Sequence, residues 1–264
     1  MTGAVEDEVP LSGGGRTAVH RRFDVVLRGP GPWSHGVIGL LGHLGDVGFR
    51  GAPRVVGTGF APDGRETLEY VQGWSAHPRA WPDEVLPVIG RTLRQLHDAS
   101  SSYVPPDGTT WQPWFGRDLG DPRRRVLGHC DTGPWNLLVR RDGSGALIDW
   151  ETAGPVDPLV ELAQACWLNA QLHGDTVAAR QGLGDVRSRA LQARALLDGY
   201  GLAAQERADV LDLMVQVAVA DAAEQVRSVT DEQETGPIWA VAWRVDAAAW
   251  IQRHRAELRA VIVG

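Results

Sequence analysis

A segment in the middle of the chain carries three polar residues whose types and spacing suit phosphoryl transfer. Asn136 follows Asp131 by five positions, and Asp149 ends the apolar stretch 146–148. A carboxylate can accept the proton of an attacking hydroxyl, while an amide oxygen and a second carboxylate can hold Mg²⁺ against nucleotide phosphates. The sequence Asp-Gly-Ser-Gly at 142–145 is typical of a hairpin turn, which would bring Asn136 and Asp149 side by side.

Signatures of several other enzyme classes are absent from the sequence. All 26 basic residues are arginine, and without lysine no phosphate-binding loop of the GxxxxGK[ST] type can form. The motifs HExxH and GxSxG are also missing, as is a GxGxxG motif after a first strand. Cys130 and Cys166 form no CxxC pair, so we expect neither a disulfide framework nor a structural zinc site.

Length, composition and charge narrow the class of protein further. The chain has 264 residues, 43% hydrophobic and 22% charged, as in a soluble protein of one large or two modest domains. The net charge of −7 argues against a nucleic-acid partner. No run reaches the ~18 uninterrupted apolar residues of a membrane span, and the acidic start does not resemble a secretory signal. We therefore expect no membrane association and a cytoplasmic location.

The elements that must position the polar residues change character near Gly73. Short strands are expected around a glycine-rich turn before residue 30, and two more at 52–60 and 66–73. Between them, residues 33–47 have near-helical apolar spacing but glycine at every third position, which favours a glycine-lined face packed against the sheet. A buried helix is expected over 83–100, and helices follow from Glu161 onward. This order predicts an α+β protein.

The segment 126–163 resembles the catalytic loop and metal-binding segment of the aminoglycoside phosphotransferase family. The run HCDTGPWN follows the family pattern HGDxxxxN, and LIDWETAGPVDPLVELA follows IDxxxxxxGDPxxDLA. The resemblance implies a two-lobed, protein-kinase-like fold with a small antiparallel-sheet N-terminal lobe and a larger helical C-terminal lobe. Residues 1–73 would bind nucleotide, and residues 74–264 would carry the catalytic loop and the acceptor site. The implied activity is transfer of the γ-phosphoryl group of ATP or GTP, with Mg²⁺, to a hydroxyl of a small molecule.

The same resemblance assigns roles to individual residues of the central segment. Asp131 would be the catalytic base, and His129 would brace its loop. Asn136 and Asp149 would be the metal ligands. Glu151 falls where relatives often carry a second acid, with a supporting role toward the metal or the acceptor.

Two further parts of the N-terminal region are implied to contact the nucleotide. Gly14 and Gly15 would belong to the glycine-rich turn over the phosphates, although hairpin turns also recruit glycine without such a role. The backbone groups of Glu69 and Val71 would face adenine, in a hinge that ends at Gly73.

The sequence departs from the kinase pattern at the phosphate-binding lysine and its glutamate partner. Arg28 stands at the place of the lysine, where its guanidinium could bind phosphate or could remain a solvated charge at a strand end. The segment 33–44, where the glutamate is expected, contains no acid. A catalytically impaired pseudokinase that binds nucleotide, or a ligand-binding protein on the same fold, is therefore the alternative to an active enzyme. Cys130, which replaces the family's usual glycine, is expected to pack in the core.

The acceptor is expected to be a small hydroxyl-bearing cation, such as an aminoglycoside or another amino-containing natural product. The basis is an excess of acids between residues 201 and 236, which would attract a cation if they face the cleft and would otherwise form solvated helix faces. Tryptophan side chains could stack on the acceptor or pack in the core. The acids are Glu206, Asp209, Asp212, Asp221, Glu224, Asp231, Glu232 and Glu234, and the tryptophans are Trp111, Trp114, Trp135 and Trp150.

Overall fold

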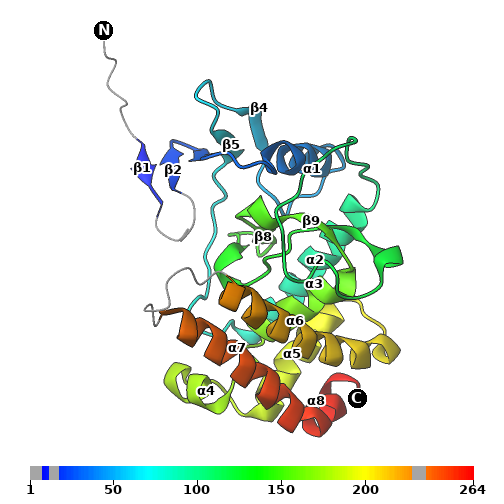
Figure 1. The fold of residues 1–264 in the computed structure, drawn as a ribbon. Coiled ribbons are helices and arrows are strands. Elements are labelled where there is room, and N and C mark those ends of the chain that lie inside the picture. The colour runs from blue at the N-terminus through cyan, green and yellow to red at the C-terminus, as the bar shows by residue number, and fades with distance from the viewer. Residues whose placement is uncertain (1–7, 12–17, 228–235) are drawn as a thin grey trace.

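The computed structural model describes residues 8–11, 18–227 and 236–264. It has a small antiparallel sheet at one end and a larger set of helices at the other (Figure 1). The strand order in this sheet is β1-β2-β3-β5-β4. The predicted α+β class is confirmed. The strands are β1 (Val9–Pro10), β2 (Val19–Arg22), β3 (Val25–Arg28), β4 (Val55–Phe60) and β5 (Glu66–Glu69).

Helix α1 (Ser34–Asp46) forms beside this sheet despite its regular glycines. Residues three apart share one helix face, so the glycines gather on one side and the apolar side chains on another, where they are buried. The predicted packing of the glycine face against the sheet is wrong. A Cβ at Gly39 would lie 2.5 Å from the hydroxyl of Tyr103, and one at Gly36 would lie 2.8 Å from Thr109. The segment that follows helix α2 (Leu86–Ser100) therefore covers this face at Gly36 and Gly39.

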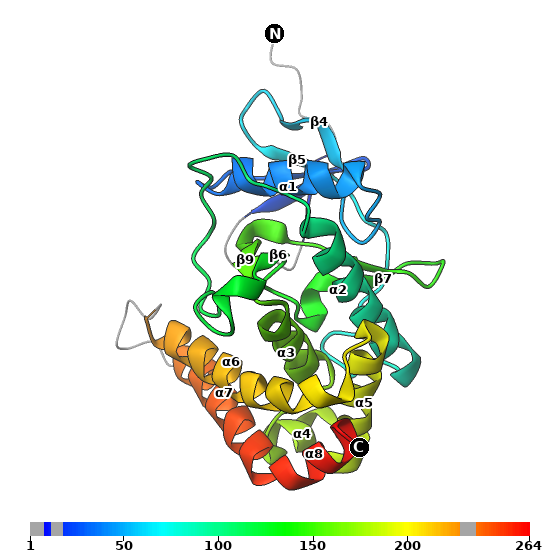
Figure 2. The same ribbon diagram turned by 90° about the vertical axis from the view of Figure 1, so that its right-hand side faces the viewer.

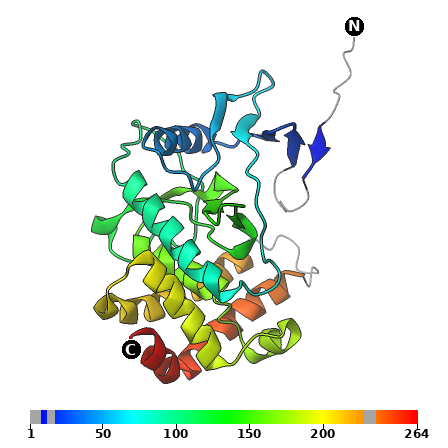
Figure 3. The same ribbon diagram turned by 180° about the vertical axis from the view of Figure 1, so that it is seen from behind.

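The helical part is built around helix α3, whose residues from Leu159 to Asn169 are all buried. Helix α6 packs on α3 and α7, and α2 packs on α5 (Figures 2 and 3). The close crossing of α2 and α5 requires Gly90, because a Cβ there would lie 2.0 Å from the carbonyl oxygen of Leu196. The helices are α2 (Leu86–Ser100), α3 (Pro158–Asn169), α4 (Asp175–Gln181), α5 (Val186–Tyr200), α6 (Arg207–Arg227), α7 (Gly236–Arg253) and α8 (Arg255–Ile262).

Two small antiparallel pairs lie between the sheet and the helices, and they carry the segment singled out in the sequence. Strand β6 pairs with β9, and β7 pairs with β8. The short 3-10 helix η3 (Pro134–Asn136) precedes β7, and the short 3-10 helix η4 (Trp150–Thr152) lies between β8 and β9. The strands are β6 (Val126–Gly128), β7 (Leu137–Val139), β8 (Gly145–Leu147) and β9 (Gly154–Val156).

The expected domain boundary near Gly73 lies in the extended segment between β5 and helix α2. A Cβ at Gly73 would lie 2.9 Å from the side chain of Leu138, so this connection passes close to strand β7. The division at residue 73 remains a prediction. Among the described residues, no helix is long and apolar enough to cross a membrane.

Candidate active site

The loop 129–136, which we call the catalytic loop, places Asn136 against Asp131. The side-chain amide Nδ2 of Asn136 donates to Asp131 Oδ2 at 2.8 Å and to the Asp131 carbonyl oxygen at 3.1 Å. Helix η3 makes this contact possible because it turns the chain back within five residues. Burial raises the pKa of the Asp131 carboxyl above the usual aspartate value, although His129 and the hydrogen bonds from Trp135 and Asn136 oppose the shift. A carboxylate with a raised pKa is a better proton acceptor.

The β7–β8 hairpin brings Asp149 beside Asn136, so the predicted hairpin is confirmed. Leu137 pairs with Leu147, and the amide of Ile148 donates to the carbonyl of Asn136 at 2.9 Å. Asp149 follows directly, with φ of 62° in the left-handed region, where the chain leaves the strand and enters η4. Its side chain is 40% exposed and open to the cavity described below.

His129 connects the catalytic loop to the strand that leads to Asp149. Its ring is fully buried, Nε2 lies 2.8 Å from the carbonyl oxygen of Ile148, and Nδ1 accepts the amide hydrogen of Asp131 at 3.2 Å. The ring also meets Trp150 edge-on, with 4.8 Å between ring centroids. These contacts fit a bracing role for His129 better than direct contact with a substrate.

Cys130 adopts φ of 65°, the left-handed backbone that glycine would adopt without strain. Its thiol is fully buried, and this burial raises the pKa of the thiol strongly. Because the thiolate is the reactive form, the raised pKa disfavours nucleophilic chemistry at Cys130.

Arg28 reaches from the sheet to Asp149. It is only 7% exposed, Nε donates to Glu66 Oε2 at 3.1 Å, and Nη1 donates to Asp149 Oδ1 at 2.5 Å. Nη1 also lies 3.7 Å from Glu151 Oε2. The alternative that Arg28 is a solvated charge at a strand end is therefore wrong. Glu66 was not among the predicted site residues, although it is an acid on the strand that pairs with the one carrying Arg28.

One polar cavity of about 350 Å³ brings these residues together. Arg28, Asp131, Asn136, Asp149 and Glu151 line one part of it. Another part of its wall comes from the segment before β6, from the catalytic loop and from helices α3, α6 and α7, including Trp114, Trp135, Gln164, Asp221, Glu224 and Arg244. The cavity thus has a carboxylate-rich part beside the sheet and an aromatic and charged part among the helices.

Gly14, Gly15, Glu69 and Val71 were also predicted to contact the nucleotide. Gly14 and Gly15 lie outside the described residues. Glu69 ends β5, and its amide donates to the Arg54 carbonyl at 2.8 Å. Val71 is buried in the connection that follows. Neither Glu69 nor Val71 lines the polar cavity.

The acids predicted to face the acceptor divide into three groups. Asp221 and Glu224 line the cavity, where Asp221 lies 2.6 Å from Arg244 Nε and Glu224 lies 2.7 Å from Arg227 Nη2. The solvated-face alternative holds for Glu206, Asp209 and Asp212, which are exposed elsewhere on the molecule. The other three, Asp231, Glu232 and Glu234, lie outside the described residues.

The tryptophans divide in a similar way. Trp114 and Trp135 line the cavity, whereas Trp150 is 1% exposed and packs in the core. Trp111 is half-buried and lies near the glycine face of α1, where it approaches Gly36.

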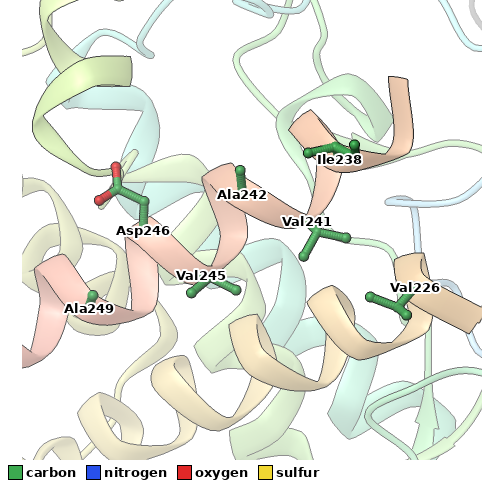
Figure 4. Close-up of a pocket in the computed structure, with 7 residues that line it drawn as sticks. All are labelled: Val226, Ile238, Val241, Ala242, Val245, Asp246 and Ala249. Carbon is green, nitrogen blue, oxygen red and sulfur yellow. The ribbon is translucent and has the colours of Figure 1, made fainter. Parts of the chain in front are cut away.

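A second, larger cavity of about 910 Å³ is lined by the side chains of helices α6 and α7. Figure 4 shows Val241 and Val245 pointing from α7 toward α6, while Asp246 points away from them. Apart from the Asp246 carboxylate, the lining of this cavity is apolar, so it lacks the groups that phosphoryl transfer requires.

Comparison with known proteins places this site in a family. The model of the phosphotransferase enzyme family (APH) matches residues 58–210. The trifolitoxin immunity protein of Rhizobium leguminosarum bv. trifolii is 52% identical over 261 residues, which cover 98% of this chain and 100% of the relative.

Solved structures share the fold at low sequence identity. A choline/ethanolamine kinase family protein from Mesorhizobium loti has a TM-score of 0.64 at 18% identity, covering 100% of this chain and 95% of that one. The amicoumacin kinase hAmiN, in complex with AMP-PNP, Ca²⁺ and Ami, has a TM-score of 0.69 at 13% identity, covering 97% and 89%. These likenesses confirm the protein-kinase-like fold. The family match and the 52% identical relative together show that the chain belongs to the APH phosphotransferase enzyme family.

Proposed function

We propose that this phosphotransferase moves the γ-phosphoryl group of ATP or GTP, bound with Mg²⁺, to a hydroxyl group of a small molecule. The observation that carries the proposal is the convergence of Asp131, Asn136 and Asp149 on one cavity that Arg28 also enters. Phosphoryl transfer needs a group to receive the hydroxyl proton and positive charge to offset the phosphates. The pseudokinase alternative has no support, because the acidic and amide groups are retained and Arg28 enters the cavity paired with a buried glutamate, Glu66 of strand β5.

The donor groups beside the sheet fit Mg²⁺. Asn136 and Asp149 would hold the cation together with phosphate oxygens, and Glu151 would support them, because hard cations prefer oxygen ligands. The Nδ2 of Asn136 is committed to Asp131, so its Oδ1 is the donor atom that remains for a cation. Bound Mg²⁺ supplies positive charge against the phosphates.

Asp131 would act as the base in the transfer. The acceptor oxygen forms a bond to the γ-phosphorus, the bond from phosphorus to the bridging oxygen of the nucleoside diphosphate breaks, and the hydroxyl proton passes to Asp131. The burial that raises the pKa of Asp131 favours this proton transfer. His129 would hold the loop in place, as its contacts with Ile148 and the Asp131 amide suggest.

The rest of the nucleotide would lie along the sheet. Arg28 would bind phosphate, and the backbone of Gly14 and Gly15 would cover the phosphates. The amide of Glu69 is already bonded to Arg54, so the Glu69 carbonyl and the Val71 amide are the groups proposed to meet adenine.

The acceptor is proposed to be a hydroxyl-bearing cation of modest size. Asp221, paired with Arg244, and Glu224, paired with Arg227, put two carboxylates on the helical part of the cavity wall, and Trp114 and Trp135 add aromatic faces that attract cations. Solved structures with this fold include kinases named for choline, amicoumacin and spectinomycin. The relative named for immunity to trifolitoxin further suggests that phosphorylation protects a cell from a toxin or antibiotic.

An acceptor screen tests this function directly. The purified chain, ATP or GTP and Mg²⁺ would be mixed with choline, aminoglycosides, spectinomycin, amicoumacin and matched neutral sugars, and phosphorylated product would be identified by mass. The proposal predicts product from a cationic member and far less product with Asp131→Asn. Product from neutral acceptors alone would overturn the proposal of a cationic acceptor. Release of nucleoside diphosphate at an unchanged rate in Asp131→Asn would overturn the assignment of Asp131 as the base.

A cell-based arm tests the protective role. Expression in a toxin-sensitive host should raise the tolerated dose of the relevant toxin or antibiotic, whereas equal expression of Asp131→Asn should not. Equal protection by both forms would show that any immunity arises without phosphoryl transfer.

A further inference from the structure

Arg28 is held by an acid from the neighbouring strand. In the ladder between β3 and β5, Arg28 stands directly opposite Glu66. Glu66 is fully buried, and its Oε2 accepts from Arg28 Nε at 3.1 Å. A buried carboxylate is costly without partners, so this pair is held firmly in one arrangement.

The second oxygen of Glu66 fixes the start of helix α1. Glu66 Oε1 accepts a hydrogen bond from the hydroxyl of Ser34, the first residue of α1, and Ser34 is 1% exposed. Ser34 Oγ in turn accepts from the amide of Gly31 at 2.8 Å. The carboxylate therefore ties three parts together: strand β3, strand β5 and helix α1.

This arrangement determines where the guanidinium of Arg28 points. With Nε bound to Glu66, the planar fork directs Nη1 to Asp149 at 2.5 Å. Nη1 therefore lies against the carboxylate that we assign to the metal. If Asp149 held Mg²⁺ and nucleotide, the guanidinium of Arg28 would be placed to meet phosphate oxygens.

We propose that Glu66 and Ser34 are positioning residues that aim Arg28 at the nucleotide phosphates. In kinases a glutamate within the helix holds the phosphate-binding lysine. Here strand β5 and the start of helix α1 supply the groups that hold the arginine. The proposal rests on the proposed function, because it requires that the cavity bind magnesium nucleotide. Neither residue touches the nucleotide; both act through Arg28.

The test is a double-mutant cycle on the full chain, read as the affinity for a non-hydrolysable ATP or GTP analogue with Mg²⁺ by calorimetry. Glu66→Gln should weaken binding about tenfold, the scale of one charge-assisted hydrogen bond. In an Arg28→Ala background the same substitution should change affinity by less than about twofold, because the arginine it positions is gone. Ser34→Ala should weaken binding in the same direction, and Ser34→Thr, which keeps a hydroxyl, should restore it.

Thr67→Val is the matched control for a purely structural effect. Thr67 lies next to Glu66 on β5, and its hydroxyl donates to the Val56 carbonyl at 2.9 Å. Its loss should lower thermal stability and leave nucleotide affinity unchanged. If Glu66→Gln does not fold, the nucleotide affinities of Ser34→Ala and Ser34→Thr still test the positioning role.

The outcomes separate this inference from the proposed function. Wild-type binding that is lost in Asp149→Asn but unchanged in Glu66→Gln and Ser34→Ala would overturn the positioning role alone. An equal loss from Glu66→Gln with and without Arg28 would also overturn it. A wild-type chain that binds no magnesium nucleotide would overturn the proposed function and this inference together.

Discussion

Glu161 Oε1 accepts a hydrogen bond from the backbone amide of Cys130 at 2.5 Å, one residue before Asp131. Its other oxygen lies 2.6 Å from His97 Nε2 on helix α2. Burial by itself would raise the pKa of Glu161, but the hydrogen bond and charge of His97 and the Cys130 amide together lower it below the usual glutamate value. Glu161 is therefore a buried carboxylate that fixes the catalytic loop from helix α3.

Replacing this carboxylate should damage both stability and turnover. Glu161→Gln removes a buried carboxylate that is hydrogen-bonded to His97 and to the Cys130 amide, so we expect the free energy of unfolding to fall by about 3 kcal/mol and kcat to fall with it. Urea denaturation and steady-state kinetics measure the two effects. Glu257→Gln is the matched control, since its carboxylate meets His254 at 3.2 Å on the exposed surface. That change should cost less than about 0.5 kcal/mol, and equal losses from both variants would contradict a special role for Glu161.

The activity should fall at low pH because the Asp131 carboxyl must be ionised to accept a proton. Asp131→Asn should lower kcat by roughly 10² to 10⁴ while nucleotide affinity is retained. Because burial raises the pKa of Asp131, activity in the wild type should fall as the pH drops through a value above the ordinary aspartate pKa of about 3.9. A pH profile of kcat/KM for the acceptor tests this. A variant within twofold of wild type would place the base elsewhere.

Arg28 should be needed for nucleotide binding rather than acceptor binding. Arg28→Ala should raise the nucleotide KM at least about tenfold, with little change in the acceptor KM. Arg28→Lys keeps the charge but loses the fork, so it should recover only part of the affinity. Arg22→Ala, an exposed change on strand β2, serves as the control. A nucleotide KM in Arg28→Ala that matches this control would show that another group binds the phosphate.

His173 should make stability depend on pH without taking part in the reaction. Its ring is buried, and burial together with nearby Arg189 lowers the pKa of His173 to about 4. A lowered histidine pKa means that the unfolded chain binds the proton first, so stability is full above about pH 6.5 and declines as the pH falls toward 4. Between pH 7.5 and pH 5 the loss should be about 2 kcal/mol.

Denaturant titrations of wild type and His173→Gln at the two pH values provide the measurement. The variant should lack this part of the pH dependence, even if its stability at pH 7.5 is lower. An identical decline in both forms would assign the pH dependence to other groups.

Local sequence was sufficient for the part of the site that folds locally. Asn136 and Asp149 are joined by a hairpin whose turn residues and apolar strands lie within fourteen positions, so their proximity follows from the turn itself. The arrangement of Arg28 and Glu66 could not be predicted in this way. These residues are 38 positions apart, and their contact depends on the register between β3 and β5, which short strands do not specify from sequence.

The helical residues that line the cavity could not be predicted from the sequence either. The spacing of acids on α6 does not tell which of them face the cavity, because that depends on the packing of α6 between α3 and α7. Asp221 faces the cavity beside Arg244 of α7, whereas Asp212 pairs with Arg255 on the surface. The glycine face of α1 was predicted to pack on the sheet, because its spacing does not show which distant segment covers it. Its cover includes Tyr103, which lies 64 positions after Gly39 in the chain.

The proposed function requires Asp149 and Mg²⁺ to bind the nucleotide together, and calorimetry measures this binding. The full chain would be titrated with a non-hydrolysable ATP or GTP analogue, with Mg²⁺ and with EDTA, alongside Asp149→Asn and the control Asp142→Asn at the exposed hairpin tip. We predict that removing Mg²⁺ or the Asp149 carboxylate weakens binding at least about tenfold, while Asp142→Asn binds like wild type. Equal affinity of wild type and Asp149→Asn in the presence of Mg²⁺ would contradict the account.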